Sequence, residues 1–110
     1  MSAIGKDFRH PRVTEDAVPG GWHRLKGSSS LITHGVEVIL KYINNRHEIG
    51  DEINITVDEV ATQVVSGLNL YLEITLKEPS MKIYAIVYNP GSTYTEHADT
   101  KVSQIYALYM

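Results

Sequence analysis

The sequence predicts an α+β fold in which one α-helix packs across a four- or five-stranded antiparallel β-sheet. Two observations predict it. One stretch carries apolar residues at helical spacing, and the apolar residues after it alternate with polar ones at a period of two. A helix followed by strands joined through turns is typical of an antiparallel meander whose apolar face the helix covers. With 110 residues, the chain has room for one such domain.

The predicted helix follows the serines at 28–30, which are favoured N-cap residues. It is expected to end before the asparagines at 44 and 45. The apolar residues at helical spacing are Ile32, Val36, Ile39, Leu40 and Ile43. Gly35 lies among them and is interpreted as a mild defect, since glycine costs a helix up to about 1 kcal/mol.

Three alternating stretches are predicted to form strands with one buried face. They contain Ile53, Ile55 and Val57; then Leu68, Leu70, Leu72, Ile74 and Leu76; then Met81, Ile83, Ala85 and Val87. A turn is expected at 77–80, a polar connection at 89–100 and a last strand at 102–109. Asp58 and Glu59 are expected to point to opposite faces of their strand and therefore not to converge for acid–base chemistry.

The N-terminal segment differs in composition from the rest of the chain. Residues 1–16 mix both signs of charge with little apolar content, so they are predicted to be a mobile leader, and 17–110 are predicted to be the folded domain. If a short strand after Gly21 pairs antiparallel with the strand that starts near Ile53, Gly20 lies at the same end of the sheet as residues 63–67 and 89–101. Three irregular segments are then predicted to meet at one rim.

The overall composition excludes several functions. The net charge is −3 with no cluster of Lys and Arg, so neither nucleic acid nor a membrane is an expected partner. The sequence has no cysteine and no His pair at metal-binding spacing, so no disulfide, metal or cofactor is expected. The first thirty residues lack an apolar run of signal-peptide length, which predicts a cytoplasmic protein. Secretion stays open if a signal peptide has been removed, and Asn54 starts a glycosylation triplet.

The stretch Gln63-Val64-Val65-Ser66-Gly67 resembles the Gln-x-Val-x-Gly hairpin of the cystatin superfamily. The surrounding features agree in order and spacing: glycines at 20 and 21, one helix, this hairpin, and then Pro90-Gly91 where the stefin branch has Pro-Gly in its second hairpin. The resemblance covers about residues 17–109. It implies a cystatin-like, cysteine-free (stefin-like) protein that is not an enzyme.

The resemblance also implies a function and a set of contact residues. The expected function is reversible, tight-binding, competitive inhibition of papain-like cysteine proteases of the cathepsin type, with the N-terminal trunk and two hairpin loops inserted into the active-site cleft. The residues expected to contact the protease are Val18, Pro19, Gly20, Gly21, Gln63, Val64, Val65, Ser66, Gly67, Asn89, Pro90 and Gly91. Independently of the family, a loop that enters a narrow cleft must be slim and preformed, and Gly67 permits a positive φ and close backbone approach.

Other interpretations stay open. The chain can be a non-inhibitory cystatin-like interaction or carrier domain, or an enzyme or ligand carrier on the same fold. A carrier needs a cavity, and an enzyme needs convergent polar groups. A monomer is expected; a domain-swapped dimer is the alternative if Val65 sits in a strained backbone conformation.

Overall fold

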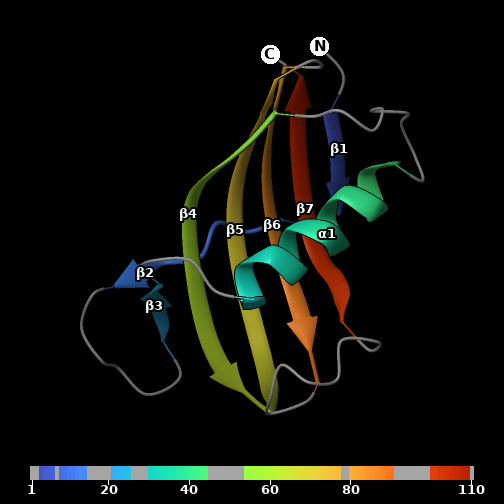
Figure 1. Ribbon diagram of the computed structural model, residues 1–110. Coiled ribbons are helices and arrows are strands. Elements are labelled where there is room, and N and C mark those ends of the chain that lie inside the picture. The colour runs from blue at the N-terminus through green and yellow to red at the C-terminus, as the bar shows by residue number, and fades with distance from the viewer. Residues whose placement is uncertain are drawn as a thin grey trace.

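The computed structural model describes most of the predicted domain and part of the segment before it. The described residues are 3–6, 8–14, 21–25, 30–44, 54–77, 80–90 and 100–109, and for 3–6 and 14 only the backbone is described. In this part of the chain, one α-helix lies across one face of a curved sheet of seven strands (Figure 1). The elements are β1 (Ala3–Lys6), β2 (Val13–Thr14), β3 (Trp22–Arg24), α1 (Ser30–Asn44), β4 (Asn54–Val65), β5 (Gly67–Lys77), β6 (Met81–Asn89) and β7 (Lys101–Tyr109).

The strand order is β1-β7-β6-β5-β4-β3-β2. Strands β3 to β7 pair antiparallel with their neighbours, which confirms the predicted α+β fold with a five-stranded antiparallel sheet. Two further strands come from the segment predicted to be a leader: β1 pairs antiparallel with β7, and the two-residue β2 pairs parallel with β3. The mobility of residues 1–16 and the domain boundary at 16 stay predictions, but part of this segment belongs to the sheet.

The helix contacts the sheet through residues spaced four apart: Leu31, Gly35, Ile39 and Ile43. A Cβ on Gly35 would lie 2.6 Å from Leu70 Cδ2 and 2.8 Å from Leu72 Cδ1, closer than such atoms can pack. Gly35 therefore has a packing role that was not expected: the missing side chain leaves room for Leu70 and Leu72 where α1 lies against β5. The predicted helix face is turned slightly, so that Ile32, Val36 and Leu40 are only partly buried.

The core lies between α1 and strands β4 to β7. The predicted buried faces of β5 and β6 are confirmed from residue 70 onward; every predicted residue there is at most 2% exposed. On β4 the prediction is wrong for Ile55 and Val57, which are each 37% exposed. They face the helix side with their partners Leu76 and Ile74, but α1 crosses the sheet obliquely and does not cover this end of β4 (Figure 1).

A β-bulge changes the faces of the acidic pair. The register of β4 and β5 shifts between Val57 and Glu59. The bulge adds one residue to β4, so Asp58 and Glu59 both lie on the face of the sheet away from the helix, which we call the outer face. The expectation that they point to opposite faces is wrong for this reason.

Candidate functional site

The tip of the β4–β5 hairpin carries the most exposed large apolar side chain in the described part of the chain. Val64 is 70% exposed and its neighbour Val65 is 43% exposed. The ladder continues to the pair of Val65 with Gly67, so Ser66 alone forms the turn. The motif found in the sequence is thus a narrow projecting hairpin that presents two valines to solvent, an arrangement that favours partner binding.

Gly67 joins this hairpin to the second loop. Its φ is +114°, which confirms the expected positive φ. A Cβ at this position would lie 2.6 Å from the carbonyl oxygen of Asn89 and 3.0 Å from the Cα of Pro90. The expected close backbone approach also exists, but it is made to the chain's own second loop. The two predicted loops therefore meet at Gly67.

Two side chains that the sequence analysis did not select fix the shape of the tip. The hydroxyl of Tyr88 donates a hydrogen bond to the carbonyl oxygen of Ser66. The amide Nδ2 of Asn69 donates to Oε1 of Gln63 at 3.0 Å, across the hairpin. Both residues flank the motifs in sequence, and the strand alternation places them on the same outer face as Gln63. That signal could have identified them.

The first predicted segment approaches the same end of the sheet. His23 pairs with Thr62 and Arg24 with Ala61, which confirms the antiparallel pairing assumed for the strand after Gly21. Because β3 and β4 run in opposite directions, Gly21 precedes β3 on the side of the hairpin tip. Val18, Pro19, Gly20 and Gly91 lie outside the described residues. The structure therefore brings together Gly21, the motif and Asn89-Pro90, which we call the rim.

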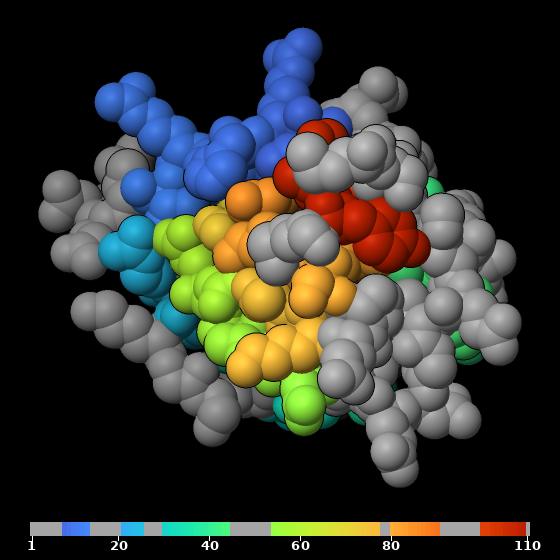
Figure 2. Space-filling view, turned by 90° about the horizontal axis from the view of Figure 1, so that it is seen from above, coloured from blue at the N-terminus to red at the C-terminus, as the bar shows by residue number. Residues whose placement is uncertain are grey.

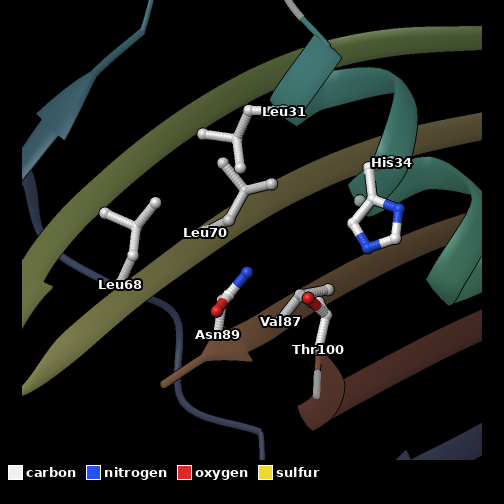
Figure 3. A pocket seen from close by; sticks show the side chains of 8 residues that line it. Leu31, His34, Leu68, Leu70, Val87, Asn89 and Thr100 are labelled. Atoms are coloured by element: carbon white, nitrogen blue, oxygen red, sulfur yellow. The ribbon is translucent and has the colours of Figure 1, made fainter. Parts of the chain in front are cut away.

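The second loop is anchored from inside and exposed at its end. Asn89 is 5% exposed, whereas Pro90 is exposed. Asn89 lines a hollow between the helix and the rim, together with Leu31, His34, Gly35, Leu68, Leu70, Val87 and Thr100 (Figure 3). The hollow has a volume of about 10 Å³, room for roughly one water molecule. It is far too small for a carried ligand, which needs several hundred Å³.

Val65 is the last residue of β4 and pairs with Gly67 in the ladder. The strained backbone conformation expected at Val65, and the domain-swapped dimer that depends on it, stay predictions.

Among the described residues, the rim and its neighbours Leu68 and Tyr88 carry no charged side chain. Charged groups gather instead on the outer face, away from the tip. Lys82 Nζ lies 2.6 Å from Asp58 Oδ2 and 3.5 Å from Glu73 Oε1, and Arg24 Nη2 lies 2.9 Å from Glu59 Oε1. A partner that covers the rim and these two neighbours would therefore meet apolar and uncharged polar groups.

The pKa values of these groups follow from their contacts. Burial raises the pKa of Asp58, but hydrogen bonds from Lys82 and Thr75 and the charge of Lys82 outweigh it, so the net pKa is lowered. The pKa of Glu59 is lowered by hydrogen bonding with Glu73 and then by Arg24. Both carboxylates are stabilised in the charged form, which is typical of structural ion pairs and unlike a poised general acid or base.

One convergent polar cluster on the outer face could be mistaken for catalytic machinery. Tyr71 Oη lies 2.9 Å from Glu73 Oε2 and 3.1 Å from His10 Nε2. Burial, and then the hydrogen bond to Glu73, raise the pKa of Tyr71 far above its ordinary value, so its hydroxyl keeps its proton. In addition, the described residues hold no group of three His, Asp or Glu side chains placed to bind a metal ion.

Comparison with known proteins agrees with the fold. A stretch of 93 residues, 84% of this chain, is 27% identical to the protein named Cystatin-2 of Ornithodoros moubata and covers 72% of that protein. No family model and no solved structure matches the chain. This similarity, together with a helix packed on an antiparallel sheet, supports a cystatin-like fold. It hints at the cysteine protease inhibitor family, and at an inhibitor rather than an enzyme. None of the described helices is long and apolar enough to cross a membrane.

Proposed function

We propose that the protein is a reversible, competitive inhibitor of papain-like cysteine proteases that inserts its rim into the active-site cleft. The observation that carries the proposal is the preformed hairpin tip. Val64 and Val65 project into solvent, while Gly67 and Tyr88 hold the tip against the second loop. A tip that already has its bound shape loses little conformational entropy on binding, so more of the contact energy appears as affinity.

The rim blocks the protease by occupying space. The valines and the uncharged backbone around Ser66 fill the cleft by van der Waals contact, and exclude substrate from the protease's cysteine thiolate. No covalent bond to the thiolate is required, because the inhibitor needs only to occupy the cleft. The cysteine-free, stefin-like type and a cathepsin-type target belong to this proposal, as do Val18, Pro19, Gly20 and Gly91 as further contacts.

Inhibition of papain by the full chain tests the proposal, with two matched variants of β4. Val64→Asp places a charge in the cleft, where it loses water without gaining a partner, so we expect inhibition to weaken about a hundredfold or more. Val57→Asp changes an exposed valine of the same strand outside the rim, and we expect unchanged inhibition. A full chain that leaves papain fully active would refute the proposal. Equal effects of the two variants would refute the role of the rim.

A non-inhibitory cystatin-like interaction domain is the second candidate. The exposed valines of the rim favour it equally, since they present an apolar surface to any partner with a narrow groove. The same titration separates the two, because only the inhibitor blocks papain.

A further inference from the structure

The first part of β4 lies at an open edge of the sheet. Near the rim, β3 covers this edge: the backbone N–H of Leu25 donates to the carbonyl oxygen of Val60 at 2.8 Å, and β3 pairs with residues 61 and 62. Over 54–59, none of the described strands pairs with the same edge of β4 (Figure 1). An edge with such unpaired backbone N–H and C=O groups is a template for a further strand.

Two exposed apolar side chains lie on this part of β4. Residues 54–58 are all exposed, and among them Ile55 and Val57 are each 37% exposed on the helix side of the sheet. Figure 2 looks onto this end of the sheet and shows the light green β4 at the surface beside the yellow β5. The bulge between Val57 and Glu59 ends the regular part of the strand. Residues 54–58, which we call the β4 edge, therefore combine open backbone groups with exposed apolar side chains.

The β4 edge is complementary to an antiparallel second copy of itself. When the two strands pair around Thr56, Ile55 of each copy lies opposite Val57 of the other, so four apolar side chains meet on the helix side. The two Thr56 side chains face each other on the outer face, where opposed threonines form hydrogen bonds. Asn54 lies opposite Asp58, so no like charges are directly opposed. A shift by one residue would turn the apolar residues of one copy to the outer face of the other.

The charges around the β4 edge are also complementary in this arrangement. Lys77 pairs with Asn54 across the β4–β5 ladder, is exposed, and takes part in none of the ion pairs among the described residues. It lies two strands away from Asp58 of the second copy on the outer face, roughly 10 Å between Cα atoms, a distance that the two side chains together span. Within the described residues, Thr75 and Lys82 both bond to Oδ2 of Asp58, so its Oδ1 is available. Such exposed pairs add little affinity but favour one register.

We propose that two copies of the chain associate through their β4 edges, so that one sheet continues across both molecules. A second copy is the occupant because the same short strand supplies both halves of the contact, as a two-fold symmetric interface requires. Each copy keeps its own fold, which distinguishes this dimer from a domain-swapped one. Because the contact is short, the dimer forms reversibly and at high protein concentration.

The association leaves both rims accessible. Thr56 lies nine residues before Val65 along β4, roughly 30 Å at the rise of a strand. Because the two β4 strands run in opposite directions, the two rims lie at opposite ends of the joined sheet. The dimer therefore does not depend on the proposed inhibition, and each of its rims is free to bind a partner.

Sedimentation equilibrium of the full chain tests the proposal. The mean mass should rise with concentration from 12.3 kDa toward twice this value, and should fall again on dilution. Val57→Asp places a charge within the contact, where it loses water without gaining a partner, and should raise the dimer dissociation constant about a hundredfold. Val64→Asp is the matched control: it changes an exposed valine of the same strand outside the β4 edge and should leave the dissociation constant unchanged.

Two variants of Lys77 test the charge complementarity. Lys77→Glu places a second carboxylate near Asp58 of the other copy and should raise the dissociation constant several-fold. Lys77→Arg keeps the positive charge and should leave the constant unchanged. Equal dissociation constants for Lys77→Glu and Lys77→Arg would contradict the register centred on Thr56.

The outcomes separate this proposal from its alternatives and from the proposed function. A mass of one chain at every concentration would overturn it, and so would a dimer that is as stable in Val57→Asp as in the unchanged chain. A dimer that does not dissociate on dilution would indicate exchanged segments and would overturn it as well. Papain inhibition should show the opposite pattern, unchanged in Val57→Asp and weakened in Val64→Asp. A full chain that forms the reversible dimer but leaves papain active would overturn the proposed function alone.

Discussion

Replacing Gly67 with alanine tests whether the rim is a rigid unit. The new Cβ would lie 2.6 Å from the Asn89 carbonyl oxygen, whereas ordinary van der Waals contact begins at 3.4 Å. These two atoms must therefore move apart by about 0.8 Å. The φ of +114° adds a second cost. A side chain in a positive-φ conformation costs roughly 1–2 kcal/mol, and relief of an overlap with packed neighbours costs roughly 1–3 kcal/mol. The expected loss in the free energy of unfolding is therefore about 2–5 kcal/mol.

The same change should separate the two loops. The atoms that meet the new Cβ include the Asn89 carbonyl oxygen and the Cα of Pro90, which belong to the backbone and cannot rotate away. The second loop must therefore shift, and we expect papain inhibition to weaken more than tenfold. Equilibrium unfolding in urea measures the first effect, and inhibition of papain measures the second.

Ser66→Ala is the matched control, because it changes the neighbouring, exposed residue of the turn without adding a side chain. It should stay within about 0.5 kcal/mol of the unchanged chain in unfolding free energy. If Gly67→Ala behaved like Ser66→Ala in both assays, the argument from φ and close contact would be refuted.

Three further changes test other parts of the account. Tyr88→Phe removes the hydrogen bond to the carbonyl of Ser66. It should lower the free energy of unfolding in urea by about 0.5–1.5 kcal/mol and weaken inhibition several-fold. Inhibition equal to that of the unchanged chain would show that the bond does not shape the tip. Gly35→Val forces α1 away from Leu70 and should lower the unfolding free energy by about 1–3 kcal/mol, whereas a more stable variant would contradict the close approach. Asp58→Asn removes a carboxylate whose pKa is lowered in the folded protein. Such a carboxylate stabilises the fold above its ordinary pKa of 3.8, and this stabilisation is lost as the pH falls through the lower pKa of the folded state. The variant should therefore be less stable near pH 7, by about 1 kcal/mol or less for this partly exposed pair, and equally stable near pH 2.

Much of the helix side of the sheet could be predicted from the sequence. The alternation in β5 and β6 identified their buried residues, because a period of two fixes which side chains share a face. The exposure of Ile55 and Val57 could not be read from the same pattern, since it depends on where the helix crosses the sheet. The packing role of Gly35 could not be predicted for a similar reason: local propensity counts its cost to the helix but not the approach to Leu70 that its missing side chain permits.

The rim was predicted in part. Gly67 required a positive φ, and the chain order placed its loop beside Asn89 and Pro90. Which side chains fix the tip was not foreseen, because the hydroxyl of Tyr88 reaches Ser66 only through the register of β5 and β6.

The layer that residues 8–14 form on the outer face, where Phe8 and Val13 pack on Ala61, Tyr71 and Ile86, had a signal in the sequence that was not used. Strands β5 and β6 are apolar on both faces over 70–72 and 85–87, where Tyr71 and Ile86 face away from the helix. A strand buried on both faces requires a second covering layer. Sequence alone does not say which segment provides that layer, because residues 8–14 combine two arginines and a proline with only two apolar side chains, Phe8 and Val13.

Amide hydrogen exchange of the chain, with and without papain, tests the central claim most directly. If the rim enters the cleft, protection on complex formation should concentrate at residues 64–68, 88 and 89, with helix α1 unchanged. Protection centred on the helix, or on the exposed end of β4 at Ile55 and Val57, would contradict the account.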